Sequence, residues 1–360
     1  MTGLRYGVIG TGLMGQEHIR NIQLLPGARI TAIADPEPAS LIAAGCRDAA
    51  HFTDAESFAA AADVDAVIVA SPNHTHREVL EPLFARGLPI LCEKPIATTV
   101  ADAAWIVDRA RRHPAPFWTG MEYRYMPPAR RFIAQVHEGR AGRLVMLAIR
   151  EHRFPFLDKV GQWNRLSRNT GGTMVEKCCH FFDLMRHIIR AEPVRVFCSG
   201  GVDVNHADER IEGQRPDIID NSYTVVDFDN GVRAMLDLCM FADGAEHQEE
   251  ISATGDTARI DLMVPPGDII FSPRVGYGNA KQAVREHVDV EAAALAAGEH
   301  FGATWHQHLA FARAVKGEGP VEVTAEDGLR AVAMGVAAEI SAREKRAVEM
   351  SEVLGVRLAA

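Results

Sequence analysis

The sequence has few cysteines, no long apolar run and no block of basic residues. Its 360 residues include six cysteines, none in a CxxC pair or at a zinc-ribbon spacing, so we expect reduced thiols rather than a disulfide framework or a structural metal site. No stretch approaches the roughly 18 apolar residues of a membrane-spanning helix. The first residues, MTGLRYGVIGTG, lack the regions of a secretory signal. These absences predict a cytoplasmic protein without a membrane partner.

The charge balance is acidic. The formal net charge is −10 at pH 7, from 38 basic and 48 acidic residues, and the basic residues are dispersed. A surface that binds nucleic acid needs clustered Lys and Arg side chains to neutralise phosphates. We therefore expect no nucleic-acid partner. The length is sufficient for two domains, each with a core of its own.

Apolar runs alternate with helical patterns in the first third of the chain. The runs are RYGVI, RITAIAD, DAVIVAS, PILCE and FWTGMEY, and helical segments lie near residues 14–25, 74–86 and 100–112. This alternation is typical of βαβ units, in which helices cover both faces of a parallel sheet. We therefore expect an α/β domain of the Rossmann type, with a doubly wound parallel sheet, over residues 1–123.

The pattern changes after residue 123. The expected elements are a helix near 129–138, the strand RLVMLAIREHR, a long helix from about Gly172, hairpins turning at Asp229-Asn230-Gly231 and at Gly255-Asp256, and helices near 305–316 and 325–346. Residues 124–360 are thus predicted to form an α+β domain. Its sheet should be large, open and mostly antiparallel, with helices on one face.

The first strand and helix enclose a glycine-rich turn. Gly10, Gly12 and Gly15 form a GxGxxG pattern, in which the glycines allow a tight turn, close approach of a pyrophosphate and close helix packing. Asp35 lies 20 residues after Gly15, where its carboxylate can accept hydrogen bonds from the adenosine ribose. The alternative is a structural turn followed by a solvated carboxylate. Because no base follows Asp35, we predict NAD rather than NADP as the cofactor.

Two later segments contain candidate catalytic residues. ILCEKPIA places Lys94 at the carboxyl end of a parallel strand, where open α/β sheets bind ligands. GGTMVEKCCHFFDLM contains Glu176 and His180, four residues apart and so on one face of the predicted helix. The alternatives are a solvated lysine, and a buried histidine whose hydrogen bonds are satisfied by the nearby carboxylate.

Together these residues resemble the Gfo/Idh/MocA family of oxidoreductases. The shared segments are GTGLMG, SPNHTH, EKP, the GG…H helix and EDGLRAVAMGVAAEISAREKRAV. The resemblance implies a site in the cleft between two domains, and a homo-oligomer, dimer or tetramer, formed through the second domain's sheet. The NAD-binding residues that it implies are Gly10, Gly12, Leu13, Met14, Gly15, Asp35, Ser71, Pro72, Asn73, His76, Glu93 and Lys94.

The resemblance also implies Lys94 and His180 as a catalytic pair. Oxidation of an alcohol requires a base, for which the histidine is suited, and a positive charge near the developing alkoxide, which the lysine supplies. How the two share the proton transfer is left open. The family usually has Asp where this chain has Glu176, and we expect the longer carboxylate either to orient His180 or to touch the substrate.

The segment REHRFPFLDKVGQWNRLSRN is rich in Arg, Trp and Asn, which suits a ligand with several hydroxyl groups. The arginines would also suit an anionic group, and a solvated surface loop is the alternative. The predicted substrate-binding residues are Tyr123, Arg124, Arg153, Trp163, Asn164, Arg165, Glu176, His180 and His306. His308 is a further candidate, but an H-x-H pattern without a carboxylate at helical spacing predicts no metal site.

The resulting hypothesis is an NAD-dependent oxidoreductase. It would move a hydride between nicotinamide and a hydroxyl carbon of a sugar, a sugar derivative or a cyclic polyol such as an inositol. One alternative is an oxidoreductive glycosidase that oxidises a sugar transiently, including an anionic glycoside. Another is a regulatory protein that binds NAD without catalysis, although such a protein needs neither Lys94 nor His180.

Overall fold

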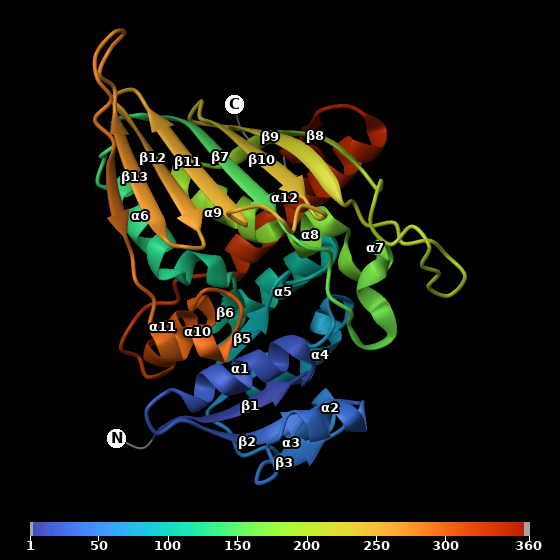
Figure 1. Cartoon of the computed structure of the whole chain (residues 1–360). Helices are drawn as coiled ribbons and strands as arrows, with labels where there is room; N and C mark the ends of the chain where they lie inside the picture. The colour runs from blue at the N-terminus through green and yellow to red at the C-terminus, as the bar shows by residue number, and fades with distance from the viewer. Residues whose placement is uncertain (1–2, 356–360) are drawn as a thin grey trace.

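The computed structural model describes residues 3–355, which form two β-sheets and the helices that cover them (Figure 1). The first sheet has six strands in the order β3-β2-β1-β4-β5-β6, and every neighbouring pair is parallel. The strands are β1 (Arg5–Ile9), β2 (Arg29–Ala34), β3 (Ala50–Phe52), β4 (Ala66–Val69), β5 (Ile90–Glu93) and β6 (Phe117–Gly120). The predicted doubly wound parallel sheet is confirmed.

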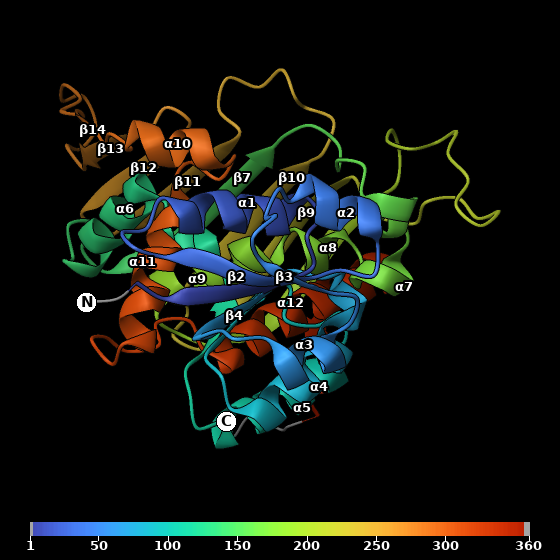
Figure 2. The same ribbon diagram turned by 90° about the horizontal axis from the view of Figure 1, so that it is seen from below.

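Helices cover both faces of this sheet, as Figure 2 shows, with α1 on one side of the strands and α3, α4 and α5 on the other. The helices are α1 (Leu13–Gln23), α2 (Pro38–Ala43), α3 (Ala55–Ala61), α4 (His76–Arg86) and α5 (Val100–Arg112). Every residue of β4, β5 and β6 is buried, which explains why these strands read as continuous apolar runs. The short edge strand β3 was not predicted, because two of its three residues are exposed and carry no apolar signal.

The second sheet has nine strands in the order β14-β13-β12-β11-β7-β10-β9-β8-β15. The strands are β7 (Leu144–His152), β8 (Pro193–Gly201), β9 (Asn221–Phe228), β10 (Arg233–Cys239), β11 (Glu249–Gly255), β12 (Ala258–Val264), β13 (Asp268–Pro273), β14 (Val284–His287) and β15 (Val348–Glu349). Among these described strands only β7 and β10 pair in parallel. Both predicted hairpins are present, and Gly231 has the positive φ of 82° that its turn requires. The mostly antiparallel sheet is thus confirmed.

The remaining helices are α6 (Pro127–His137), α7 (Ser167–Thr170), α8 (Thr173–Glu176), α9 (Cys179–Ile189), α10 (Ala292–Ala297), α11 (Ala303–Val315), α12 (Ala325–Glu344) and α13 (Met350–Leu354). Helices α6, α9 and α12 lie on the face of the second sheet that is turned toward the first (Figure 1). In the described part of the chain, no helix combines the length and apolar character needed to cross a bilayer.

The predicted long helix near Gly172 is wrong, because it is broken in two. Helix α8 ends at Glu176 and α9 begins at Cys179. Between them the Cys178 N–H donates to the Thr173 carbonyl, five residues back, at 3.1 Å. This bond spans five residues instead of four, as in a π-turn, and it interrupts the regular α-helical pattern.

Helix α12 is the element shared by both halves. It contacts α5 and β6 on one side and α8, α9 and β8 on the other. Thr324 and Asp327 form a capping box at its start. At Gly335 it approaches α8 so closely that an added Cβ would lie 2.5 Å from the Met174 carbonyl oxygen. The predicted domain boundary near residue 123 falls in the 3₁₀ helix η2 (Glu122–Tyr125), between the two sheets.

We predict that Gly335→Val destabilises the protein, because the new side chain would push α12 away from α8. Overpacking of this kind costs about 1–3 kcal/mol of unfolding free energy. Urea denaturation followed by circular dichroism measures the change. Gly244→Val is the matched control, since a Cβ at Gly244 meets no atom within 4 Å, and equal stability of the two variants would contradict the close packing.

Candidate active site

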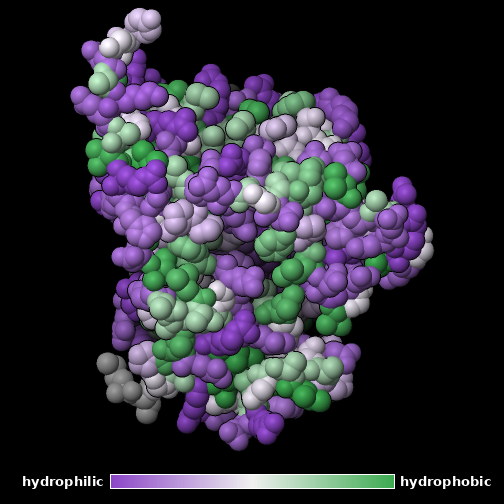
Figure 3. All heavy atoms as spheres, in the orientation of Figure 1, coloured by the Kyte–Doolittle hydropathy of each residue, from purple (hydrophilic) through white to green (hydrophobic). Residues whose placement is uncertain are grey.

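A cleft of about 870 Å³ lies at the carboxyl ends of the parallel strands. Its walls are the residues that follow β1, β2, β4 and β5, together with the loop before α7 in the second half of the chain. The surface is hollowed between the two halves in the space-filling view (Figure 3). Open parallel sheets bind their ligands at this edge.

The three glycines of the first turn have the geometry that a dinucleotide site needs. Gly10 has a φ of 87°, and a Cβ there would lie 2.5 Å from the backbone of Ala70. At Gly15 a Cβ would lie 1.9 Å from the Gly10 carbonyl oxygen, so this glycine lets α1 pack against the turn. Gly12 instead faces open space, because a Cβ there would have no atom within 4 Å. The start of α1 is thus accessible to a pyrophosphate.

Asp35 is fixed at the end of β2. Its Oδ2 accepts hydrogen bonds from the N–H and the hydroxyl of Thr11, at 2.7 and 3.1 Å. Its Oδ1 accepts from the Glu37 N–H at 2.9 Å. Among the described residues that line the cleft, the cationic side chains are those of Lys94 and Lys159. Neither lies in the loop after β2, beside Asp35. A carboxylate held in this way can accept from ribose hydroxyls and would repel a 2′-phosphate.

Most of the other predicted cofactor residues also line the cleft. They are Leu13, Met14, Ser71, Pro72, Asn73, Glu93 and Lys94. His76 does not, which corrects its predicted role. Its ring is fully buried, with Nδ1 3.0 Å from the Pro95 carbonyl and Nε2 3.0 Å from the Ser71 carbonyl. His76 therefore ties together the loops after β4 and β5, and it supports the cleft without facing it.

Lys94 projects from the end of β5 toward α8. Its Nζ lies 3.5 Å from the backbone carbonyl oxygen of Glu176. Burial alone would lower the pKa of Lys94, but surrounding acidic groups, among them Glu122 and Glu93, raise it above its ordinary value. The side chain is therefore an ammonium at neutral pH.

His180 lies in the first turn of α9 and is 1% exposed. Its ring stacks on that of Tyr123, with centroids 4.1 Å apart and planes 10° apart, and its Nε2 lies 3.4 Å from Glu122 Oε1. Burial, reinforced by the positive charges of Lys94 and Lys177, holds the pKa of His180 well below its usual range. The imidazole is therefore neutral near pH 7, the form that can accept a proton.

Glu176 interacts with a lysine of the cleft wall. Its Oε1 lies 2.8 Å from Lys159 Nζ, and its Oε2 is buried without a hydrogen-bond partner. The helix break at residues 177 and 178 separates it from His180, so the expectation that the two share one helix face is wrong. The carboxylate closes the cleft against the second domain's loop.

Three other predicted substrate residues lie near the site. Trp163 lines the cleft, and the Lys159 ammonium lies 4.4 Å from its ring centroid. The Tyr123 hydroxyl lies 2.6 Å from Lys177 Nζ and 3.2 Å from Glu249 Oε1. The charge of Arg153 is among those that lower the pKa of His180.

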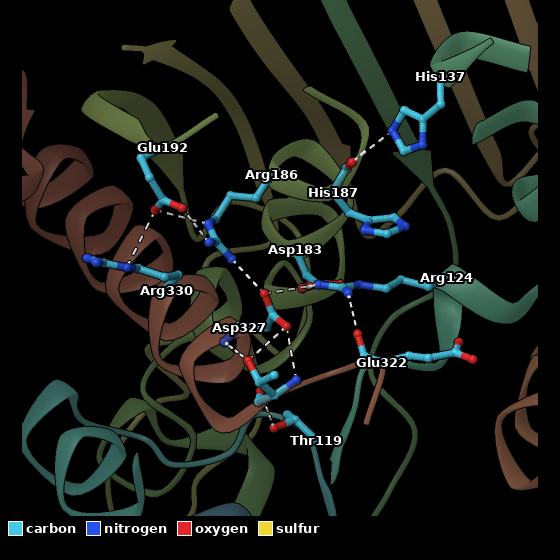
Figure 4. A network of polar contacts seen from close by, with 11 residues as sticks. Thr119, Arg124, His137, Asp183, Arg186, His187, Glu192, Glu322, Asp327 and Arg330 are labelled. Carbon is cyan, nitrogen blue, oxygen red and sulfur yellow. Dashed lines mark hydrogen bonds and ion pairs between the residues drawn. The ribbon is translucent and has the colours of Figure 1, made fainter. Parts of the chain in front are cut away.

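The structure gives Arg124 a different role from the predicted one. Its guanidinium is buried in a polar network, where it donates to Asp183 Oδ2 at 2.6 Å and to the Glu322 carbonyl at 3.2 Å (Figure 4). Asp327 of α12 lies beside it and accepts from Arg186 of α9 at 3.0 Å. Arg124 thus links η2 to α9 and α12, and its donors are not free for a substrate.

Three further predictions are corrected for the same reason. Arg165 is 2% exposed and pairs with Asp158 and Glu209, at 2.5 and 2.9 Å. Asn164 is fully buried and donates to the Leu157 carbonyl. The His306 ring lies 3.1 Å from Glu291 and away from the cleft lining.

His308, the further candidate, is also placed elsewhere. It is completely buried, with its Nε2 2.8 Å from His18 Nδ1. His18 in turn lies 2.9 Å from Glu93 Oε1. These three side chains connect α1 and α11 to the end of β5 behind the cleft.

Two residues beside His180 were missed. Glu122 follows the last parallel strand, a position that could have drawn attention because carboxyl ends of strands carry ligand-binding groups. His300 lies in the loop before α11, and its Nε2 is 3.8 Å from Glu122 Oε1. No local pattern in the sequence marks it, because tertiary packing alone brings this loop to η2.

The parallel sheet, the open glycine turn and the half-buried ammonium of Lys94 near a neutral imidazole are those of a dinucleotide-binding oxidoreductase. The Gfo/Idh/MocA family described as "Oxidoreductase family, NAD-binding Rossmann fold" matches residues 4–121. Its "C-terminal alpha/beta domain" matches residues 133–350. The chain therefore belongs to the Gfo/Idh/MocA oxidoreductase family, and its first domain is the NAD-binding one.

Individual relatives agree with this assignment. The chain is 27% identical to the myo-inositol 2-dehydrogenase of Thermotoga maritima over 360 residues, which covers 98% of this chain and 100% of that one. It is 31% identical to the rhizopine catabolism protein MocA of Rhizobium meliloti over 193 residues, 54% of this chain and 59% of the relative. The crystal structure of an oxidoreductase domain protein from Kribbella flavida superposes with a TM-score of 0.84 at 20% identity, covering 97% of this chain and 100% of the other.

We predict that Asp35→Ala weakens NAD binding and reduces discrimination against NADP. Loss of a charged hydrogen-bond acceptor costs about 1.5–3 kcal/mol, which corresponds to roughly a 10- to 100-fold rise in the Kd for NAD. Titration of both dinucleotides by isothermal calorimetry measures the change. Comparable affinity of the unaltered protein for NAD and NADP would contradict the role given to Asp35.

Proposed function

We propose that the protein is an NAD-dependent dehydrogenase that oxidises a hydroxyl carbon of a cyclic polyol or sugar of the inositol-like class. The observation that carries this proposal is that Lys94, which lines the cleft, and the neutral His180 imidazole both lie near Glu122. His180 and Glu122 are buried behind Lys94 and do not line the cleft themselves. The full-length similarity to a myo-inositol 2-dehydrogenase supports the substrate class.

The proposed chemistry divides between the two side chains. A neutral imidazole takes the hydroxyl proton as the carbon is oxidised, and His180 has its pKa held low enough for this. The fixed ammonium of Lys94 stabilises the negative charge that develops on the oxygen, an effect that is large in a site shielded from water. Bound NAD supplies the hydride acceptor. The glycine turn and Asp35 position that acceptor.

The second domain supplies the proposed substrate contacts. Trp163 offers an apolar ring face at the cleft wall, and Lys159 and Glu176 beside it offer a donor and an acceptor for hydroxyl groups. A Lys–Glu pair can open and rebind to two hydroxyls of a polyol, because each partner has the complementary hydrogen-bonding capacity.

The direct test is to incubate the purified protein with NAD and a panel of inositols, other cyclic polyols and pyranoses, and to follow NADH by its absorbance. Formation of NADH with one member of the panel is the expected result. Aglycone release from glycosides without net NADH would replace this proposal by the oxidoreductive glycosidase. Tight NAD binding without turnover of any kind would favour the regulatory protein.

We predict that Lys94→Ala and His180→Ala each lower kcat by about 100-fold or more, because each removes charge stabilisation or the base. The Kd for NAD should change little in His180→Ala, which lies outside the cofactor residues. Steady-state kinetics and calorimetric titration measure the two quantities. Near-normal kcat in both variants would contradict the assignment.

We also propose a homo-oligomer, dimer or tetramer, that forms through the outer face of the second sheet. Phe197, Val225 and Met235 are 44%, 42% and 39% exposed. They lie in register on the neighbouring strands β8, β9 and β10. Tyr223 and Met146 add further exposed apolar area. A contiguous apolar face of this kind is typical of a protein interface.

We predict that Val225→Asp weakens the oligomer, because it places a charge in the middle of the apolar row. Size-exclusion chromatography with light scattering should give a multiple of the 39.3 kDa chain mass for the unaltered protein and a smaller species for the variant. Ile42→Asp, an exposed apolar position on α2 of the first domain, is the control. A monomeric unaltered protein would contradict the proposal.

A reducing compartment is proposed from the thiols. The six cysteines are free, and four of them are buried. Burial raises the pKa of Cys92, Cys178 and Cys179, which keeps these groups as thiols. We therefore place the protein in the cytoplasm.

A further inference from the structure

We propose that Glu122 and His300 form a relay that carries the proton taken up by His180 to solvent. This inference rests on the proposed function, since each oxidation of a hydroxyl carbon releases one proton. His180 is 1% exposed, and one face of its ring is covered by Tyr123. The ring therefore needs a route by which it returns to the neutral state after each turnover.

Glu122 occupies the first position of this route. Its Oε1 lies 3.4 Å from His180 Nε2, and the carboxyl group is 1% exposed. Neither carboxyl oxygen has a well-formed hydrogen bond with the protein. A buried carboxyl group without fixed partners is unusual, because such groups are normally satisfied. It can rotate between two neighbours without breaking a strong bond.

His300 occupies the second position. Its Nε2 lies 3.8 Å from Glu122 Oε1, and its side chain is 24% exposed, so it connects the buried carboxyl group to water. The other ring nitrogen, Nδ1, lies 2.7 Å from Glu17 Oε1, which also accepts from the Thr304 hydroxyl at 2.8 Å. Helix α1 and the start of α11 thus hold the ring with Nε2 toward the site.

The electrostatic surroundings suit proton exchange near neutrality. The groups that face Glu122 and His300 are Glu93 at the end of β5, Lys94 directly after it, Tyr123 of η2, His180 of α9, Glu17 of α1 and Thr304 of α11. Burial, with the charge of Glu93, raises the pKa of Glu122 to about 7. Burial opposes protonation of His300, but Glu17 outweighs it and raises the pKa of His300. Glu122 can therefore give and take a proton at physiological pH.

Each turnover moves one proton along this route and one electron pair to the cofactor. The substrate O–H bond breaks as an N–H bond forms at Nε2 of the His180 ring, and the hydride would leave the carbon with its electron pair for bound NAD, which supplies the acceptor. The imidazolium then gives its Nε2 proton to Glu122 Oε1, which returns His180 to the neutral form. The carboxyl proton passes to His300 Nε2, after that nitrogen has released its own proton to water.

The test uses Glu122→Gln in the full-length protein with NAD and the substrate found in the panel. Glutamine keeps the size of the side chain but cannot carry a proton. We expect kcat at pH 7 to fall by about 10- to 100-fold. General acid–base catalysis typically contributes about 100-fold or more, and the loss of a relay behind the base should cost no more than the lower end of that range. KM and the Kd for NAD should stay within about twofold, which a structural defect in the site would not allow.

The pH profile gives a second readout. Glu122 must be ionised to accept a proton, so kcat of the unaltered protein should rise as the pH passes upward through about 7, the pKa of Glu122. In Glu122→Gln this rise should be absent. Glu122→Asp, which keeps an ionisable group, should regain the rise and part of kcat. His300→Gln should lower kcat in the same direction, with rescue by imidazole.

The control is His287→Gln, because His287 pairs with Asp268 at 2.8 Å on the edge strand β14, in the same manner as His300 with Glu17. It should match the unaltered protein. If Glu122→Gln keeps full kcat and the pH dependence, or if Glu122→Asp is as impaired as Glu122→Gln, the relay is overturned while the dehydrogenase stands. If the unaltered protein oxidises no member of the panel, both proposals fall.

Discussion

The cluster of buried charges between the two sheets is the constraint on which the rest of the structure depends. A charge removed from water is costly unless opposite charges or hydrogen bonds compensate it. Here Lys94 is compensated by carboxylates that come from β5, η2 and α8. His180 avoids the cost by remaining neutral. One ammonium at the cleft wall and one buried, neutral imidazole are thereby held near each other, an arrangement that suits the proposed alcohol oxidation.

The cluster requires the two halves of the chain to stay in a fixed relation. Helix α12 provides one fixed contact, because Gly335 lets it lie directly on the backbone of α8. The buried pair of Arg124 and Asp183 provides another, since it joins η2 to α9 within the network of Figure 4. Breaking a buried ion pair leaves an uncompensated charge, so this network resists relative movement of Glu122 and His180. Residues that touch no substrate thus set the geometry of the site.

The two sides of the cleft differ in how firmly they are built. The cofactor side consists of turns fixed by backbone hydrogen bonds and by Gly10 and Gly15, where an added Cβ would clash with the backbone. The opposite side is a loop that reaches the cleft through the Lys159–Glu176 pair and the Trp163 ring. Such a division lets a constant dinucleotide site serve different substrates, because the loop can change without disturbing the parallel sheet.

The sequence by itself determined the features that depend on neighbours along the chain. The continuous apolar strands, the glycine turn, the acidic residue after β2 and the hairpins at Gly231 and Gly255 are all local patterns, and each of these predicted features is present. Local motifs also singled out Lys94 and His180, the two residues that are proposed here to be catalytic.

Tertiary structure alone decided which polar side chains face the site. Arg124, Arg165 and His306 have side chains of the kind that bind polar ligands, but each is already paired with a carboxylate from another element or loop of the chain. His300 lies 178 residues from Glu122 in the chain, and no periodicity encodes their meeting. Helices α8 and α9, which are separated by the break, both pack on α12 from near the end of the chain. The physical reason is that the packing of whole helices and strands determines which side chains meet. Sequence patterns report only the spacing of apolar residues within each helix or strand and the positions of its ends.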